Sequence, residues 1–292
     1  MNKAISFQPS AFSRIAAGAL DKSMDREAVV AGQFYPGNAA ALRRTIESYI
    51  CAPESRLDAQ AVLVPHAGYM YSGAVAGEVF SAISLPRRII LLGPNHTGRG
   101  APLALSPPGA WHLPLGTARI DDAMNRGLLE ECPDLQEDAS AHRGEHSLEV
   151  QIPFLQVLQP DFRFSAIVVR TIDYSQLQDL GHAMARLIRT LKEPVLLVAS
   201  SDMTHYETAK DAAKQDQFAV DRILAMDPEG LHQTVLEKDI SMCGFAPTVA
   251  VLVACNDLGA SKGRLIRYTN SGAASGDYER VVAYAGIAIG RW

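Results

Sequence analysis

The sequence predicts a single α/β domain in which helices cover both faces of a central, mostly parallel or mixed sheet. Two observations support this prediction. Four short apolar runs have continuous rather than alternating hydrophobicity, as expected of strands that are covered on both faces. Helix-like segments follow three of them, and a repeated alternation of strand and helix is typical of a parallel sheet flanked by helices. No internal repeat or low-complexity linker divides the chain.

The individual elements follow from these patterns. Buried strands are expected at 61–65, 87–93, 164–170 and 194–200. Helices are expected over 73–83, 174–191 and 210–226. In the second of these helices, apolar residues recur near the 3.6-residue helical period. Two further strands, 264–270 and 281–289, are expected on either side of the turn-rich segment SGAASGD.

Two segments are expected to lie outside this regular pattern. Residues 1–25 contain no continuous apolar stretch, so we expect a loosely ordered leader rather than a secretory signal, with the folded domain spanning 26–292. The stretch 98–132 is rich in Gly and Pro and is expected to form a long excursion or lid. Long ordered loops are often functional.

The composition excludes several classes of function. The chain has 292 residues, 48% of them apolar and 20% charged, which is ordinary for a globular protein. A net charge of −5 argues against nucleic-acid binding through phosphate contacts. No run approaches the roughly 18 consecutive apolar residues that would span a membrane. Four cysteines without a CxxC pair favour a reduced, cytoplasmic protein.

Histidines follow the ends of several apolar runs. His66 ends the segment VLVPH, His96 ends IILLGPNH, and His205 lies in VLLVASSDMTH. The carboxyl ends of parallel strands meet at one edge of a sheet, where ligands bind. A lone histidine is more often structural, but two at two strand ends predict a shared site. Neutral imidazole is the commonest metal ligand in proteins, so a metal or acid/base site is expected at this edge.

Two further candidates each have an alternative interpretation. Cys243 offers a third metal ligand as a thiolate, although free cysteine also behaves as a small buried hydrophobe. Asp202 and His205 are three residues apart, so on a helical turn the carboxylate would orient the imidazole. The alternative for Ser200, Ser201 or Asp202 is to cap the helix that follows.

The remaining candidates are weaker. Glu145 and His146 open an amphipathic segment, for which a solvated helix face is the default. Tyr69, Tyr71 and Tyr206 place phenolic hydroxyls near the expected cleft, where packing is their commoner role. The glycine-rich GPNHTGRG fits neither the P-loop nor the dinucleotide-binding pattern, which argues against nucleotide binding.

Six motifs occur in an order that resembles the Memo family, which includes the protein B component of the AmmeMemoRadiSam system. They are AVVAGQFYPG (28–37), PHAGYMYSG (65–73), LLGPNH (91–96), EHSLEVQIPFL (145–155), SSDMTHY (200–206) and CGFAP (243–247). The resemblance covers nearly the whole chain from about Arg26. It implies a fold like that of class III, LigB-type extradiol dioxygenases, with one metal site at the edge of the sheet.

The resemblance also implies a set of site residues. By motif, His66, His96 and Cys243 would hold one transition-metal ion, and Asp202 and His205 would line the same pocket. Extradiol enzymes bind Fe(II) with two histidines and a carboxylate. A thiolate in the third position is softer and suits copper, zinc or iron, so iron or copper is expected, with zinc possible. The motif EHSLE also brings Glu145 and His146 into the pocket.

The leading hypothesis is therefore a cytoplasmic, dioxygenase-like metalloprotein with redox activity. In it, His205, oriented by Asp202, acts as acid or base on bound oxygen or on a small, phenolic substrate. One alternative is a non-catalytic module that holds a peptide or partner protein in the same cleft. Another is a zinc-type hydrolase, in which the metal lowers the pKa of bound water to about 7. The resemblance further implies radical-SAM and AMMECR-like proteins as functional associates.

Overall fold

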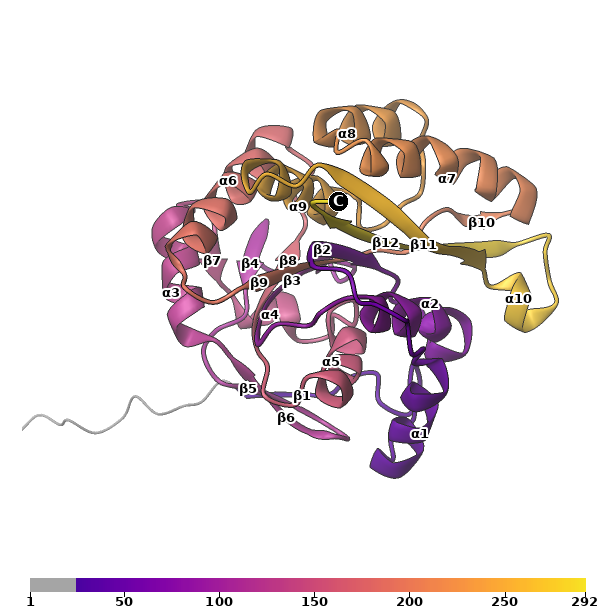
Figure 1. The fold of residues 1–292 in the computed structure, drawn as a ribbon, viewed down its shortest axis with the longest axis horizontal. Coiled ribbons are helices and arrows are strands. Elements are labelled where there is room, and N and C mark those ends of the chain that lie inside the picture. The colour runs from indigo at the N-terminus through magenta and orange to yellow at the C-terminus, as the bar shows by residue number, and fades with distance from the viewer. Residues whose placement is uncertain (1–24) are drawn as a thin grey trace, which may run out of the picture.

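The four predicted buried strands form the centre of the sheet. A computed structural model of the protein describes residues 25–292, and Figure 1 shows its arrangement. The central strands are neighbours in the order β8 (Arg163–Val169), β3 (Arg88–Pro94), β9 (Val195–Ser200) and β2 (Ala59–Val64). All three pairings are parallel, which confirms the predicted centre.

Antiparallel and parallel strands extend this centre on both sides into a twelve-stranded mixed sheet. Beyond β2 lie β12 (Val281–Gly290), β11 (Lys262–Asn270) and β10 (His205–Glu207), all paired antiparallel. Beyond β8 lie β6 (Gly116–Ile120), β5 (Ala110–Leu113), β1 (Arg26–Glu27), β4 (Leu103–Leu105) and β7 (Gln136–Glu137). The terminal strands predicted at 264–270 and 281–289 are thus confirmed as β11 and β12.

Helices cover both faces of the sheet, as predicted. One face carries α3 (Asp122–Glu131), α6 (Tyr174–Thr190), α7 (Ala209–Leu224), α8 (Pro228–Glu237) and α9 (Phe245–Asp257). The other carries α1 (Ala39–Tyr49), α2 (Tyr69–Ala82), the 3-10 turn η1 (Glu149–Gln151) and α5 (Ile152–Leu158). Two short helices, α4 (Ala139–His142) and α10 (Gly272–Ser275), lie in connections.

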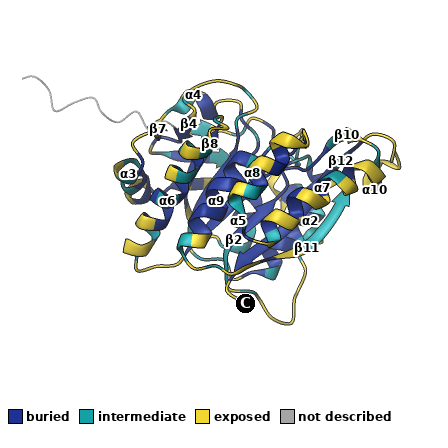
Figure 2. Cartoon of the chain, turned by 90° about the horizontal axis from the view of Figure 1, so that it is seen from above, coloured by how far each residue is buried: buried dark blue, intermediate teal, exposed yellow. Residues whose placement is uncertain are grey.

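Two apolar cores result, one on each face. Successive residues of β2 point into different cores. Leu63 belongs to the core on the α9 side of the sheet, and Val62 and Val64 belong to the core on the α2 side. This alternation is what a strand buried on both faces produces. Figure 2 shows the same division, with helices dark blue where they meet the sheet and yellow on their outer sides.

The stretch 98–132 is not the lid that its Gly and Pro content suggested. It forms β4, β5, β6 and α3, which belong to the sheet and to one helical layer. Leu105, Trp111 and Ile120 from this stretch are buried. The strands are only three to five residues long, too short to show a periodic pattern against the surrounding turn residues.

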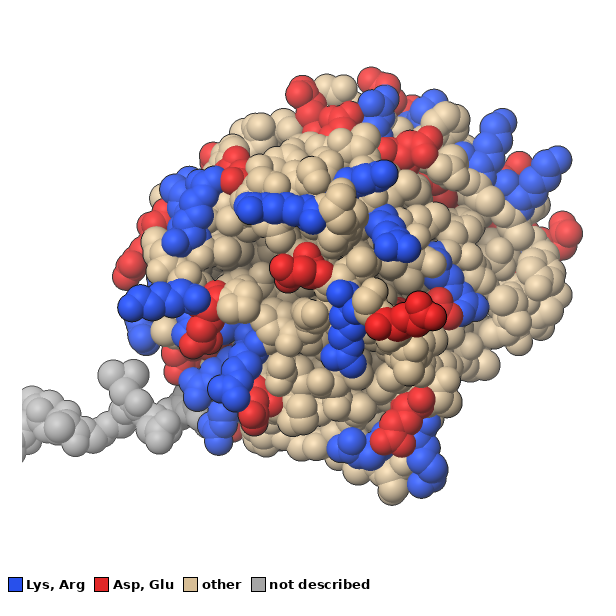
Figure 3. Space-filling view, in the orientation of Figure 1, with Lys and Arg blue, Asp and Glu red and all other residues tan. Residues whose placement is uncertain are grey.

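Three further predictions concern the leader, membrane-spanning segments and surface charge. The predicted leader, apart from Asp25, lies outside the described residues. Within the described part, no helix is long and apolar enough to cross a membrane. On the face seen in Figure 3, basic and acidic side chains are interspersed and form no continuous basic stripe.

The packing of α6 against α9 generates a test of the fold. Replacing a helical glycine by alanine normally stabilises a helix by up to about 1 kcal/mol. At Gly181 in α6, an added Cβ would lie 2.7 Å from the Ala250 carbonyl oxygen and 2.6 Å from the Val253 Cβ of α9. Because backbone cannot yield as a side-chain tip does, we expect Gly181→Ala to lower the free energy of unfolding by about 1–3 kcal/mol. Urea denaturation measures this change.

Gly127→Ala in α3 is the matched control. There the close contact is with the tip of a flexible side chain, Leu187 Cδ1 at 2.5 Å, which yields more easily than backbone. We therefore expect a much smaller loss, or a gain, from this second variant. Equal stability of the two variants would show that α6 and α9 are not packed as closely as described.

Candidate metal site

The carboxyl ends of three parallel strands meet at one cleft, as predicted. His66 follows β2, His96 follows β3, and Asp202 follows β9. All three line the same cleft, together with His146 from the connection before η1. Residues far apart in the sequence are therefore brought together by the sheet.

Three histidines form the centre of this site. One ring nitrogen from each of His66, His96 and His146 lies within 4.8 Å of the others, which is close enough to hold a metal ion. The rings of His96 and His146 are stacked with centroids 4.7 Å apart, and the His66 ring stands edge-on to both at 5.2 and 5.5 Å. His146, expected only as a pocket residue, is thus part of the cluster itself.

The orientation of the His66 ring is fixed by a buried hydroxyl. Ser200 Oγ donates its only hydrogen to the Ser147 carbonyl oxygen at 2.6 Å and accepts a hydrogen bond from Gln151 Nε2 at 3.0 Å. Its contact with His66 Nδ1, also 3.0 Å, must therefore be donated by the ring. The proton of the neutral imidazole is thus on Nδ1, and the lone pair of Nε2 is left for a ligand.

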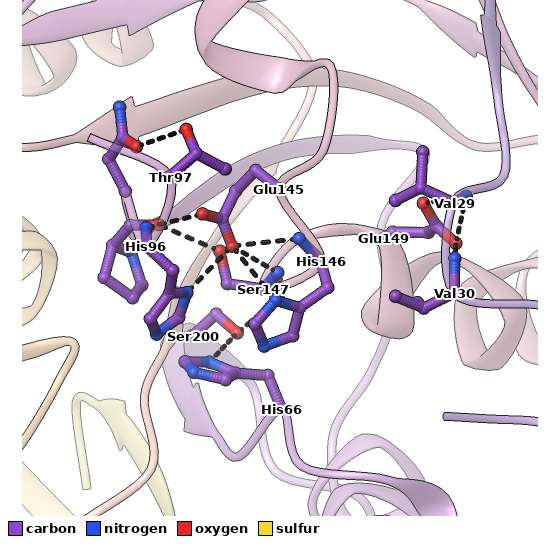
Figure 4. A network of polar contacts seen from close by, with 12 residues as sticks. Val29, Val30, His66, His96, Thr97, Glu145, His146, Ser147, Glu149 and Ser200 are labelled. Atoms are coloured by element: carbon purple, nitrogen blue, oxygen red, sulfur yellow. Dashed lines mark hydrogen bonds and ion pairs between the residues drawn. The ribbon is translucent and has the colours of Figure 1, made fainter. Parts of the chain in front are cut away.

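A buried carboxylate orients the other two histidines (Figure 4). Glu145 accepts hydrogen bonds from His96 Nδ1 at 2.9 Å and from the His96 backbone N–H at 2.6 Å. It also accepts the backbone N–H groups of His146 and Ser147, each at 2.9 Å. A carboxylate behind a histidine is the usual partner that fixes a metal ligand's tautomer and raises its basicity.

The protonation states suit metal binding. Burial lowers the pKa of both His66 and His146, so these rings are neutral near pH 7 and have a free lone pair. Burial alone would raise the pKa of Glu145, but its hydrogen bonds from the His96 ring and from the Ser147 N–H outweigh this and lower it to about 2. Glu145 therefore stays ionised.

Cys243 lies beside one member of the cluster. Its Sγ is 3.2 Å from His66 Nε2 and accepts a hydrogen bond from the Asp202 N–H at 3.3 Å. Burial and the nearby Asp202 carboxylate raise the pKa of the Cys243 thiol, which keeps it protonated in the absence of a cation. The predicted ligand is thus placed next to the cluster, on the side of His66.

Asp202 and His205 both line the cleft, but the prediction that the Asp202 carboxylate orients the His205 ring is wrong. His205 Nδ1 donates to the Ser241 carbonyl at 2.9 Å, while Asp202 Oδ1 accepts the His66 backbone N–H at 2.8 Å. Residues 201–207 form no helical turn, so the shared face that a three-residue spacing has on a helix does not arise here. The capping alternative also fails, because Thr208 caps α7.

The segment that begins at Glu145 is buried rather than a solvated helix face. Glu149, which the sequence did not single out, is fully buried and accepts hydrogen bonds from the backbone N–H groups of Val29 and Val30 and from the Tyr35 hydroxyl. It also pairs with Arg26 at 2.7 Å. Its position next to the apolar residues Leu148 and Val150 is the only signal of its burial in the sequence.

The cleft has a volume of about 700 Å³ and an aromatic rim. Phe34, Tyr71, Tyr206 and Tyr284 contribute rings to its lining. Tyr69, expected in the pocket, is not among the lining residues: it is buried, and its hydroxyl donates to the Val150 carbonyl at 2.7 Å. As the first residue of α2, it turns into the core beneath the cleft.

A mixed α/β sheet with three histidines at its carboxyl edge defines the class: an α/β protein with a candidate metal site. The comparison with protein families identifies the group more closely. The family model described as Memo-like protein matches residues 26–288, so the chain belongs to the Memo family.

The relatives are similar along their whole length. A MEMO1 family protein of Methanopyrus kandleri is 39% identical over 282 residues, covering 92% of this chain and all of the relative. One from Aquifex aeolicus is also 39% identical and covers 90% of this chain and 98% of its own. A relative from Methanothermobacter thermautotrophicus is 37% identical, with 90% and 99% coverage.

The hydrogen bonds around Ser200 predict the tautomer of His66. In metal-free protein, we expect the neutral ring to carry its proton on Nδ1, because Ser200 Oγ has no hydrogen left to donate to it. Ser200→Ala removes the acceptor and should shift the ring toward the Nε2–H form. Histidine ¹⁵N NMR measures both states.

His142 serves as an internal reference for this measurement. Its Nε2 contacts the Ala104 carbonyl at 3.1 Å, so it should show the opposite tautomer in the same spectrum and be unaffected by the Ser200 substitution. Observation of an Nε2–H ring at His66 in the wild-type protein would contradict the proposed hydrogen-bond directions.

Proposed function

We propose that the protein binds one iron or copper ion and uses it in oxidoreductase chemistry on a small phenolic molecule. His66 and His96 would hold the ion, with His146 and Cys243 completing the donor set. The observation that carries this proposal is the cluster of three imidazoles whose ligand atoms lie within 4.8 Å. Donor atoms that bind a metal at 2.0–2.3 Å lie roughly 3–4 Å apart, and the 3.2 Å between Cys243 Sγ and His66 Nε2 fits this spacing.

The chemistry of the donors favours a transition metal. Imidazole suits zinc, copper and iron, and a thiolate adds a soft, electron-donating ligand that hard ions such as Mg²⁺ do not select. The surrounding residues are built for neutral ligands: Ser200 and Glu145 each accept an Nδ1–H and so direct a free nitrogen toward the cluster. An iron or copper ion at this place would supply electron transfer to or from a bound substrate.

The chain's own residues would position the substrate and move its proton. Tyr71 and Tyr206 present rings at the cleft, which suits a planar aromatic molecule. The His205 ring is held by Ser241 through Nδ1, which leaves Nε2 as the nitrogen able to accept a proton from a phenolic hydroxyl. Asp202, whose carboxylate is held by the His66 N–H, lines the same cleft. We propose His205 and Asp202 as the acid/base pair on this basis.

A second candidate is metal-assisted hydrolysis. Three histidines with an open position are also the ligand set of catalytic zinc, which lowers the pKa of bound water to about 7. The geometry of the cluster formed by His66, His96 and His146 supports a zinc hydrolase as well as it supports an iron or copper oxidoreductase. The metal found in isolated protein, and oxygen uptake with Fe(II), separate the two. Association with radical-SAM and AMMECR-like proteins, and a cytoplasmic location, are further proposals that rest on the family resemblance.

Metal content tests the site. We expect protein purified without added metal to contain about one transition-metal ion per chain, as measured by elemental analysis. A His66→Ala, His96→Ala double variant should lose it, because both removed rings are central donors. His146→Ala and Cys243→Ser should each weaken binding roughly 10- to 100-fold or more, which is the loss seen even for residues behind the ligands.

His182→Ala is the matched control, since this half-buried histidine pairs with Asp257 on α9, away from the cleft. It should retain the wild-type metal content. Unchanged stoichiometry in the His66, His96 double variant would eliminate the proposed site, whereas full loss in His182→Ala would show that the assay reports folding rather than ligation.

Substitution of His205 tests the acid/base role. We expect His205→Gln to keep its metal, because the ring is not part of the cluster, and to lower turnover of a catechol substrate by about 10²–10⁴-fold. Oxygen consumption with Fe(II)-loaded protein and a panel of catechols measures the rate. Wild-type activity in His205→Gln would exclude this residue as the acid/base, and absence of oxygen uptake with every catechol would favour the hydrolytic alternative.

A further inference from the structure

A second cavity lies at the opposite end of the sheet from the histidine cluster. It is a groove of about 720 Å³, bounded by α1, the hairpin of β5 and β6, the end of α5 and the first residues of β3 and β8. The histidines lie beyond the carboxyl ends of the strands, whereas this groove lies at their amino ends. The two sites are therefore separate.

Five arginines line this groove: Arg43, Arg87, Arg88, Arg119 and Arg163. The acidic residues in the lining are Asp161 and Glu193. The groove therefore carries an excess of positive charge in a chain whose net charge is −5. Two uncharged polar residues and three apolar ones complete the lining: Thr117, Gln156, Leu115, Pro160 and Phe162.

Three of the arginines are aligned across neighbouring strands. Arg119 of β6 is the register partner of Arg163 in β8, and Arg163 is the register partner of Arg88 in β3. Both pairings are parallel, so the three side chains leave the sheet on the same face. Like charges directly opposite one another are destabilising in a sheet. The arrangement thus costs stability unless an anion relieves it.

The acidic neighbours neutralise only part of this charge. Arg88 lies 3.4 Å from both Asp121 and Glu193, and Arg87 makes an exposed pair with Asp161. Within residues 25–292, the ion pairs and side-chain hydrogen bonds of this groove involve Arg87 and Arg88, and none involves the guanidinium group of Arg43, Arg119 or Arg163. Three free guanidinium groups therefore share one groove.

We propose that this groove binds a small molecule that carries two or more phosphate groups. Guanidinium groups form paired, charge-assisted hydrogen bonds with phosphate oxygens, and three of them match a chain of adjacent phosphates. The groove is large enough for a nucleotide-sized ligand, and its few apolar side chains offer little for an apolar one. Inorganic polyphosphate and organic di- or triphosphates share this chemistry.

Calorimetric titration of the full chain with inorganic tripolyphosphate at physiological ionic strength tests the proposal. We expect saturable binding that weakens as salt is raised, and a loss of roughly tenfold or more in affinity for Arg119→Gln, Arg163→Gln double-variant protein. The double variant should also melt at a higher temperature than the wild type without ligand, because it removes the like-charge pair. A merely structural role for these arginines would lower the melting temperature instead.

Two controls separate this groove from other sites. Arg126→Gln removes an exposed arginine of α3 outside the groove and should leave binding unchanged. The His66→Ala, His96→Ala variant should also bind tripolyphosphate normally, which excludes binding through a metal at the histidine cluster. A competition titration with ATP distinguishes the two sources of phosphate. Tighter binding of ATP than of tripolyphosphate would identify an organic phosphate as the ligand.

Three outcomes would overturn the proposal. They are the absence of binding by the wild type, equal binding by the Arg119, Arg163 double variant, and loss of binding in the histidine variant. Tighter binding of an oligoglutamate peptide than of either phosphate compound would also reject the ligand class, since it would assign the groove to an acidic protein segment.

Discussion

The ionised carboxylate of Glu145 is the group on which the site depends. Removing a carboxylate from water costs several kcal/mol unless hydrogen bonds replace the lost solvent. Four N–H groups do so here, from the ring and backbone of His96 and the backbones of His146 and Ser147. Satisfying this one charge therefore fixes the loop after β3 against the segment before η1. The stacked pair of histidines is a consequence of that constraint.

A second buried carboxylate extends the same constraint to the start of the described chain. Glu149 holds the backbone of Val29 and Val30 and pairs with Arg26, whose guanidinium also donates to the Glu145 and His142 carbonyls. Hydrogen bonds to charged groups contribute about 1.5–3 kcal/mol each, so a polar network takes the place of apolar packing here. The segment near Phe34, whose ring lies 4.7 Å from that of His146, is thereby placed at the cleft.

The fold could be predicted from the sequence wherever local patterns reflect burial. Continuous apolar runs located β2, β3, β8 and β9, and the strand-end rule brought His66 and His96 together. Three features of the structure could not be predicted from local sequence patterns. Helix α9 is apolar on every side and has no amphipathic period. The strands within 98–132 are too short to stand out. The place of His146 depends on a buried Glu145, whose role arises only from contacts distant in sequence.

The sheet also has an open side, at β11. In the described part of the chain this strand pairs only with β12, so one row of its backbone groups is left without a neighbouring strand. Such a row can recruit another chain's edge and start aggregation. Here Lys262, Arg264 and Arg267 place positive charge along it, and Arg267 pairs with Glu78 of α2. A second copy approaching edge to edge would meet the same charges. Colloidal stability of the folded protein is therefore built into a strand that takes no part in metal binding.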